Sequence, residues 1–584
     1  MNQRIAKRFE DPDQMVKEML PLGASIHLAA TMSRPNALIY ALTRQFFDKK
    51  PDFTISVAGL HSSAHALTMA GVIKKAIIGF AGDNYPRPQP NALYSNILKG
   101  EPFEVELWSL LTLIQRLQAG AMRLPGFVTN SLLKTDMITD KLNKTVHVYP
   151  SPDSTEKDPK NFAVVQPLNP DFTLIHAVLG DEDGNLLLTN PSGEGIWGAM
   201  AATKGVIATC ERIVPRGSIP AELISIPGTR VISIAEAKFG AHPQSLRIFP
   251  LPHLEIYNEL STYMDDYEFQ IDANHAAAGD EKLKKRWMDE WVYGPKSHED
   301  YLRYVGSQRL RKLTKLPDPQ PMLPPQDAES VNDSEQMIIL AARAIMEHVK
   351  RRGYTTLLAG IGAAHIACWT AARLLAKEGI PVHVMTELGF YSMTPSVGDV
   401  FLFSQLHANG SQGLSDITQI LGMLVPDKCL GVMGAAEIDW FGNVNSIATA
   451  KGKFIVGSGG ANDIASTADC IIVAKAIRQR YVRKVNFITT NGDRVKEAVC
   501  QFGRFRRDKM EHLFEFTNWI APPSDPEMEV EEAVLKFTSW FPPDEIPPKD
   551  EPKPTSEELT ILRSLDPDRI YIEQFMVYRS LPGD

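Results

Sequence analysis

The sequence predicts an α/β protein built from two similar domains, each with an open, mostly parallel sheet. Its 584 residues are enough for two large α/β domains. Short apolar runs of strand length recur along the chain, and several are followed by helical patterns, as in parallel sheets with crossover helices. A proline-rich acidic segment, Leu316–Asp333, separates the two sets of runs. We therefore expect one domain over 1–315, a linker over 316–333 and a second domain over 334–584.

The first half opens with a strand, a turn and a helix. SIHLAA (Ser25–Ala30) has the length and apolar character of a buried strand, a turn with Pro35 follows, and ALIYALTRQFF (Ala37–Phe47) has helical spacing. Further strand-like runs in this half are FTISVAG, KKAIIGF, FTLIHAVLG and GVIATCE.

The second half repeats this opening. YTTLLAG (Tyr354–Gly360) is the predicted strand, IGAA the turn, and HIACWTAARLLAKEG (His365–Gly379) a helix that Gly379 closes. Later strand-like runs are VHVMTE, CLGVMGA, KFIVGSG and DCIIVAK. The proline-rich region Pro522–Pro554 and the helical pattern SEELTILRSL predict an irregular tail wrapped on this domain.

Composition excludes several functional classes. With 44% hydrophobic residues and a net charge of −9, the chain is typical of a soluble globular protein and does not resemble a nucleic-acid binder. The most apolar stretch, Thr355–Ala376, contains charged and glycine residues and does not suit a membrane span. No signal peptide is visible, and the five cysteines form no CxxC pair. We expect a cytoplasmic protein without a disulfide framework or a metal site.

Glu387 is the first candidate for chemistry. In VMTELGFY it stands where an apolar strand ends and a turn at Gly389 begins. The carboxyl end of a parallel strand faces the edge of the sheet where ligands bind, so this carboxylate is well placed to reach a cleft. The alternative is an ordinary solvated loop glutamate.

The second candidate is the glycine-rich segment FIVGSGGAND (Phe454–Asp463). A strand that runs into Gly457, Gly459 and Gly460 can present several backbone N–H groups to a phosphate or to a developing oxyanion. It matches neither the P-loop nor GxGxxG. The alternative is a simple turn.

The third candidate is the basic segment Arg478–Lys484, RQRYVRK, which follows the strand DCIIVAK. Arg and Lys bind phosphates well, but a charge run is also typical of a solvated face. Weaker candidates are His242, more simply a hydrogen-bonded loop histidine, and Glu106, either a site carboxylate or a residue at a helix entry. No Ser-His-Asp set and no HExxH motif can be assembled.

Taken together, these segments resemble the family I coenzyme A-transferases, and most closely glutaconate CoA-transferase with its two subunits fused in one chain. In the second half the resemblance rests on VMTELG, SVGD, EIDWFGNVNS, FIVGSGGANDIAS and RQRYVRKV. In the first half it rests on FTLIHAVLGDEDGNL, TCERIV, IPG, AKFGAHPQS and EWVYGPKSHEDYLRYVG. The resemblance covers nearly the whole chain and implies a tandem pair of CoA-transferase-like domains.

The resemblance also implies roles for individual residues. Glu387 corresponds to the family's nucleophilic glutamate, and Gly460 to a glycine whose N–H helps form the oxyanion hole. Asn36 is a candidate second donor, because the turn HLAATMSRPN lacks the family's usual Gly-Gly pair. The residues expected to line the CoA channel or to bind CoA are Gly360, Gly362, Gly457, Ser458, Gly459, Ala461, Asn462, Arg480 and Lys484.

The implied activity is transfer of CoA between an acyl-CoA and a carboxylic or dicarboxylic acid through a glutamyl-CoA thioester. CoA is then a co-substrate, and no permanently bound cofactor or metal is required. The alternative is an acyl-CoA hydrolase or lyase of the same fold. Some relatives open a ring by C–C hydrolysis or decarboxylate an acyl-CoA, and in that case Glu106 would be the acid/base. The family's assembly of αβ units implies a homodimer or larger oligomer, without nucleic-acid or membrane partners.

Overall fold

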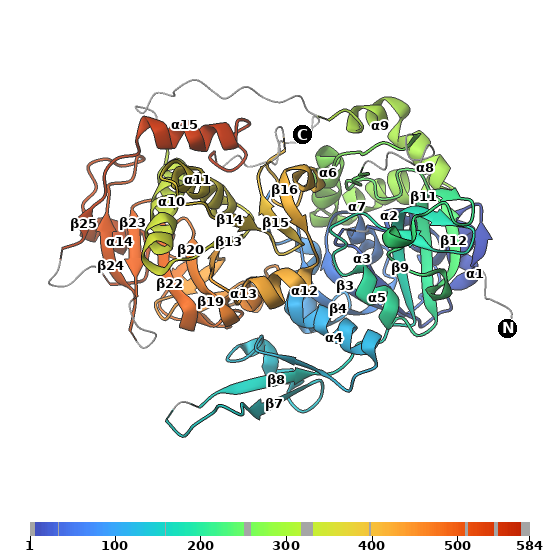
Figure 1. The fold of residues 1–584 in the computed structure, drawn as a ribbon, viewed down its shortest axis with the longest axis horizontal. Coiled ribbons are helices and arrows are strands. Elements are labelled where there is room, and N and C mark those ends of the chain that lie inside the picture. Colours follow the sequence, from blue (N-terminus) through green and yellow to red (C-terminus); the bar gives the residue numbers. More distant parts are fainter. Residues whose placement is uncertain are drawn as a thin grey trace.

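The computed structural model describes residues 6–32, 34–157, 159–249, 259–316, 331–395, 399–507, 512–541 and 547–573. Figure 1 shows two α/β bodies side by side, the first half in blue to green and the second in yellow to red. Most of the predicted linker lies outside the described residues. The domain boundaries therefore stay a prediction.

The first half is built on a nine-stranded sheet. Its order is β1-β12-β11-β9-β2-β3-β4-β5, with every neighbouring pair parallel, and β10 pairs antiparallel with β9. The strands are β1 (Lys7–Phe9), β2 (Ser25–Leu28), β3 (Phe53–Leu60), β4 (Ile73–Ala81), β5 (Glu104–Leu107), β9 (Phe172–Asp181), β10 (Leu186–Leu187), β11 (Gly205–Val214) and β12 (Val231–Glu236).

The second half is built on an eight-stranded sheet of order β14-β13-β17-β20-β22-β23-β24-β25. Its first five strands are parallel, and β23 is antiparallel to both β22 and β24. The strands are β13 (Thr356–Ala359), β14 (His383–Met385), β17 (Cys429–Met433), β20 (Asp469–Val473), β22 (Val495–Cys500), β23 (Gly503–Arg506), β24 (Glu515–Trp519) and β25 (Lys549–Asp550).

The two sheets share one topology. The parallel order β12-β11-β9-β2-β3 of the first half has the same connectivity as β22-β20-β17-β13-β14 of the second. The prediction of two similar, mostly parallel sheets is thus confirmed. Since all five strands of each set point the same way, their carboxyl ends lie along one edge, where ligands of such sheets bind.

Helices cover the two large sheets, and three smaller sheets lie within one half or the other. The helices are α1 (Pro12–Met19), α2 (Asn36–Phe46), α3 (His65–Met69), α4 (Leu110–Met122), α5 (Gly195–Ala201), α6 (Tyr267–Ala278), α7 (Glu281–Met288), α8 (His298–Val305), α9 (Ser307–Leu313), α10 (Asp333–Arg352), α11 (Ala363–Lys377), α12 (Ile417–Gln419), α13 (Ala461–Thr467), α14 (Val530–Phe537) and α15 (Ser556–Leu565). Smaller sheets are formed by β6 (Phe127–Thr129), β7 (Val146–Pro150) and β8 (Asn161–Val165), by β15 (Phe390–Met393) and β16 (Ser411–Leu414), and by β18 (Glu437–Asp439), β19 (Val444–Asn445) and β21 (Tyr481–Val482).

Most predicted elements are present. SIHLAA and ALIYALTRQFF become β2 and α2, and SEELTILRSL is α15. The expectation of a strand in KFIVGSG is wrong: it forms only isolated bridges, Ala448↔Phe454 and Phe80↔Gly457. The reason is that this run pairs with the end of β4 in the other half instead of joining a sheet.

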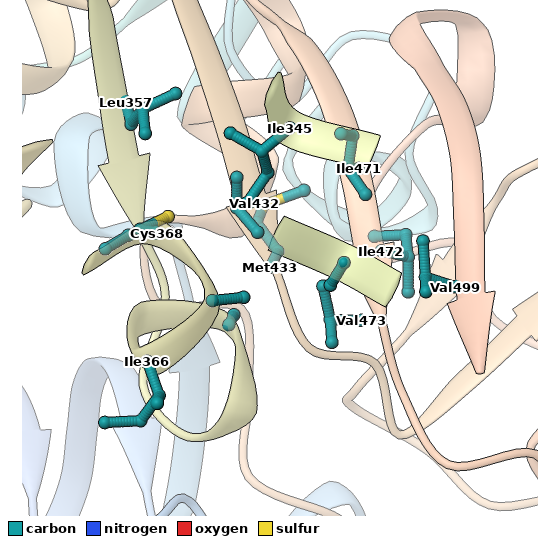
Figure 2. Packing of buried hydrophobic residues seen from close by; sticks show 14 of the residues in the cluster. Ile345, Leu357, Ile366, Cys368, Val432, Met433, Ile471, Ile472, Val473 and Val499 are labelled. Carbon is teal, nitrogen blue, oxygen red and sulfur yellow. The ribbon is translucent and has the colours of Figure 1, made fainter. Parts of the chain in front are cut away.

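The core of the second half lies between its sheet and two long helices. Figure 2 shows Ile345 of α10 beside Val432 of the central strands, and Ile366 of α11 belongs to the same apolar cluster. α10 is held at its start by a capping box between Asn332 and Glu335.

The same core continues across the seam between the halves. Met32, Leu111 and Ile114 of the first half belong to the apolar cluster of the second. Polar contacts cross here too: the Tyr571 hydroxyl donates to the Pro86 carbonyl at 2.9 Å, and Trp197 Nε1 donates to Asp416 at 3.1 Å. The seam is therefore packed, which fixes groups from the two halves against one another.

The C-terminal helix α15 is tied to α10 by a buried ion pair. Arg563 Nε donates to Glu335 Oε1 at 2.7 Å, and the Glu335 side chain is fully buried. We expect Arg563→Ala to lower the free energy of unfolding by up to about 3–5 kcal/mol, because it removes the nearer cation from a buried carboxylate and leaves only Arg569, whose Nη2 is 3.6 Å from Glu335 Oε1. The exposed pair Lys377–Glu557 joins α11 to α15, so Lys377→Ala is the control and should cost less than about 1 kcal/mol. Equal losses in urea titrations of the two variants would contradict this assignment.

Candidate active site

Glu387 occupies the turn that joins β14 to β15, as the strand-end argument predicts. The turn needs Gly389, whose φ is +121° and whose added Cβ would lie 2.6 Å from both Pro191 Cβ and Ser415 O. Pro191 belongs to the first half. The carboxylate is thus held at the seam, and only glycine allows the two halves to close around its turn.

Gly460 lies directly against Glu387. It is the N-cap residue of α13, and its backbone N–H acts on the Glu387 carboxylate by lowering its pKa. A Cβ added at Gly460 would lie 2.0 Å from Glu387 Oε2, which no side chain can occupy. The structure therefore brings together the two residues predicted as nucleophile and oxyanion donor, which the sequence separates widely.

The site raises the pKa of Glu387 to about 7. Burial of the carboxylate is the largest cause, the negative charge of Asp463 adds to it, and the Gly460 N–H acts in the opposite direction. A carboxylate with a pKa near neutrality is more basic than an ordinary glutamate and still ionises at physiological pH.

Asp463 is the site residue that the sequence analysis did not single out. It lies on the first turn of α13, three residues after Gly460, and is 1% exposed. Its carboxylate accepts the backbone N–H of Leu111 at 2.9 Å across the seam. The sequence does contain a signal for this role: Asp463 ends the GSGGAND motif and stands at helical spacing from Gly460.

The glycine-rich loop is used differently from the predicted nest of N–H groups. The N–H of Gly457 donates to Ser446 O at 2.9 Å, and that of Gly459 donates to Gly79 O at 3.1 Å. Gly459 O in turn accepts the N–H of Leu110 at 2.9 Å. Two of the three glycines therefore fasten the loop to its surroundings and to the first half, and Gly460 supplies the N–H that meets Glu387.

The remaining loop residues surround this contact. Ser458 Oγ donates to Gly459 O at 3.0 Å, and the Ala461 N–H donates to Ser458 O at 3.3 Å. Asn462 is 1% exposed, and its side-chain Nδ2 has no hydrogen-bond partner among the described residues. It is a donor that remains available to a bound molecule.

The predicted channel residues Gly360 and Gly362 lie at the carboxyl end of β13, next to β14 in the sheet. The Gly360 N–H donates to Val432 O at 2.8 Å, and the Gly362 N–H donates to His365 Nδ1 at 2.9 Å. This turn and the Glu387 turn therefore share one edge of the sheet.

Arg480 and Lys484 follow β20, whose carboxyl end lies at that edge three strands from β14. Arg480 is partly buried and donates from Nη1 to Lys475 O at 2.9 Å. Burial and the charge of Arg87 lower its pKa. Lys484 is exposed. At about 4.8 Å per strand, the end of β20 lies roughly 14 Å from the end of β14 along the edge, and the two cations follow β20 in the chain.

Asn36 begins α2 and is 2% exposed. Its backbone N–H donates to Arg34 O at 2.9 Å, and its side-chain amide donates to Ala241 O and to Gln244. Ser63 donates to its oxygen at 2.8 Å. These contacts hold Asn36 within the first half, and its role as a second oxyanion donor stays a prediction.

Glu106 lies on β5 at the far edge of the first sheet. It accepts from Lys75 at 2.8 Å, from Arg116 at 2.9 Å and from Trp108 Nε1 at 2.8 Å. Burial raises its pKa, but the hydrogen bond from Lys75 and the charge of Arg116 outweigh burial and lower it overall. A carboxylate that is ionised and accepts from three donors suits a structural role better than that of a general acid.

His242 is buried and bonded on both ring nitrogens, to the Tyr301 hydroxyl at 2.6 Å and to Asp266 at 3.1 Å. This is the arrangement of a hydrogen-bonded structural histidine. Within the described ranges, no group of three His, Cys, Asp or Glu side chains is arranged to hold a metal ion. Nor does any helix of those ranges have the length and apolar character to cross a membrane.

The raised pKa of Glu387 has a consequence for stability. A carboxyl whose pKa is higher in the folded than in the unfolded chain favours folding when protonated, so stability falls as the pH rises from about 4.5 to about 7. We expect Glu387→Gln to be more stable than the wild type at pH 8, by on the order of 1–3 kcal/mol, and to show a higher unfolding temperature. At pH 5 the difference should nearly vanish, because Glu387 is then protonated in the folded protein.

Glu378→Gln is the control for this prediction. Glu378 is an exposed helix-end residue paired with Lys350, so its replacement should change stability little at either pH. Equal unfolding temperatures of Glu387→Gln and wild type at pH 8 would show that the folded protein does not destabilise the ionised form of Glu387.

Comparison with known proteins finds similarity to CoA transferases. A model of the coenzyme A transferase family matches residues 9–237. One subunit of glutaconate CoA-transferase from Acidaminococcus fermentans is 26% identical over 215 residues, covering 34% of this chain and 61% of the relative. The other subunit of the same enzyme is 28% identical over 166 residues, covering 26% of this chain and 59% of the relative. The chain thus spans about three fifths of the length of these relatives.

The fold has a counterpart among solved structures. An acyl-CoA transferase from Escherichia coli O157:H7 superimposes with a TM-score of 0.64, covering 95% of this chain and 96% of that one at 14% sequence identity. At this identity the likeness is one of fold. It extends over both halves, so the tandem arrangement of the two sheets is that of a known single-chain protein.

Proposed function

We propose that this chain, which is similar to the coenzyme A transferases in sequence and fold, moves CoA between an acyl-CoA and a carboxylic or dicarboxylic acid through a thioester on Glu387. The observation that carries the proposal is the contact between Glu387 and Gly460: a carboxylate with a raised pKa lies against a backbone N–H at a helix start. CoA is a co-substrate in this scheme.

The reaction uses the carboxylate as a nucleophile. Glu387 attacks the acyl carbonyl carbon of the acyl-CoA, the carbon–sulfur bond breaks, and CoA leaves as a thiolate while the acyl group and Glu387 remain joined as a mixed anhydride. The thiolate then attacks the glutamyl carbonyl carbon, and the first acid leaves as a carboxylate. A second carboxylate enters and reverses both steps, so that the charges balance and no oxidant or metal takes part.

The surroundings of Glu387 support each step. The Gly460 N–H, which lowers the pKa of the resting carboxylate, is placed to stabilise negative charge on the glutamyl oxygen when the thiolate adds. Glu387 is only partly exposed at the packed seam, which limits the access of water to the anhydride and the thioester.

Binding of the remote part of CoA increases the rate of transfer further. Arg480 and Lys484 follow β20, whose carboxyl end lies three strands from that of β14 at the same sheet edge, and they are the cations that we assign to the phosphates of a long, extended ligand. The turn at Gly360 and Gly362 lies between these two strand ends, at the end of β13, where the connecting arm would pass. Such binding energy promotes the reaction at a distant carbonyl.

The test is exchange of a labelled carboxylic acid into CoA esters, screened over acyl-CoA donors and acceptor acids. Transfer predicts that label enters the CoA ester only when a matching acceptor is present. Release of free CoA without any acceptor would instead favour the hydrolase or lyase activity. A homodimer or larger oligomer remains the expected assembly, to be measured by light scattering.

A further inference from the structure

Asp463 is buried beside the nucleophile and has no part in the proposed transfer steps. It stands three residues after Gly460, so the two share the first turn of α13. Glu387 contacts Gly460 directly, so Asp463 lies one helical turn from the residue that Glu387 contacts.

Asp463 also joins the halves. Its Oδ2 accepts the N–H of Leu111 at 2.9 Å, an N–H of the first turn of α4 that has no partner within the helix. The hydroxyls of Ser109 and Ser131, both from the first half, lower the pKa of this carboxyl, and its Oδ1 has no hydrogen-bond partner among the described residues. Asp463 therefore fixes the start of α13, and with it Gly460, against the other half of the protein.

The two carboxylates repel one another. Among the described residues, Asp463 is the charged side chain that raises the pKa of Glu387, and the other neighbour acting on it is the uncharged Gly460 N–H. Burial raises the pKa of Asp463 itself to about 6, and Ser109, Leu111 and Ser131 act in the opposite direction.

We propose that Asp463 is a positioning residue that acts through Glu387: it fixes Gly460 beneath the nucleophile, and its negative charge favours the neutral thioester form of Glu387 over the free carboxylate. The inference rests on the proposed function, because it assumes that Glu387 is the residue converted to a thioester.

The free carboxylate and the thioester differ in charge at Glu387. As a carboxylate, Glu387 places a second negative charge beside Asp463, whereas as a CoA thioester it carries none at that atom. Formation of the thioester therefore relieves the repulsion that the free enzyme contains. A repulsion equivalent to one pKa unit shifts the ratio of thioester to free carboxylate about tenfold.

The test compares wild type with Asp463→Asn, which keeps an oxygen for the Leu111 N–H and removes the charge. Each protein is incubated with an acyl-CoA and its product acid over a range of pH, and the fraction carrying CoA on Glu387 is measured by mass spectrometry. We expect the pH midpoint for thioester formation to move down by about one unit, and the thioester ratio at pH 8 to fall about tenfold.

Asp463→Ser is a second neutral variant, whose hydroxyl can also accept the Leu111 N–H, and it should show the same displacement. Asp439→Asn is the control, because Asp439 is equally buried and bonded to backbone N–H groups but belongs to β18. A wild type that gains no CoA would refute the proposed function. A wild type that gains CoA on Glu387, with unchanged midpoint and ratio in both neutral variants, would refute the role of Asp463 alone.

Discussion

Glu387→Gln is expected to abolish CoA transfer, with a loss in kcat of at least about 10⁴-fold. The amide keeps the shape of the side chain and can still accept the Gly460 N–H, but it cannot attack a thioester or form an anhydride. The measurement is exchange of labelled acid into CoA ester with the best donor and acceptor pair.

Two further variants make this result specific. Glu378→Gln, at the exposed end of α11, should keep full activity. Glu106→Gln distinguishes the two activities that the family resemblance implies, since loss of turnover there with full turnover in Glu387→Gln would favour a hydrolase or lyase. Full transfer activity in Glu387→Gln would refute the proposed mechanism.

Gly460→Ala is expected to lower kcat by about 10²–10³-fold. The added methyl group would lie 2.0 Å from Glu387 Oε2, so the carboxylate or the start of α13 must move, and the N–H no longer meets the oxygen. The loss should appear in kcat more than in KM, because the N–H acts on the reacting carbonyl and not on the remote part of CoA.

Gly413→Ala is the matched control. A Cβ at Gly413 would meet its nearest atoms, both of Tyr391, at the ordinary distances of 3.6 and 3.7 Å. It should therefore be as active as the wild type. Equal activity of Gly460→Ala and Gly413→Ala would show that the close contact with Glu387 has no part in catalysis.

Local patterns in the sequence predicted the elements that depend on local physics. Apolar runs of strand length followed by helical spacing predicted the paired openings of the two halves, and Glu387 could be placed at a strand end because Gly389 follows it. The α15 helix was predicted from its sequence alone, since its cap and spacing are contained within it.

Contacts between the halves could not be predicted in this way. Asp463 and Leu111 are 352 residues apart in the sequence, and their hydrogen bond exists only because the two halves pack against one another at the seam. The same packing brings the Gly79 carbonyl to the N–H of Gly459, which donates to it. This N–H of the glycine-rich loop is therefore already used within the protein. A pattern of residue types specifies which groups can bond, but the docking of the halves decides which of them do.

The most direct test of the proposed mechanism is the mass of the intact protein after incubation with an acyl-CoA and no acceptor acid. We predict a gain equal to CoA less one water molecule, located by peptide mapping on Glu387 and absent from Glu387→Gln. An active enzyme that never gains this mass, or that gains it on another residue, would contradict the proposal that Glu387 carries CoA.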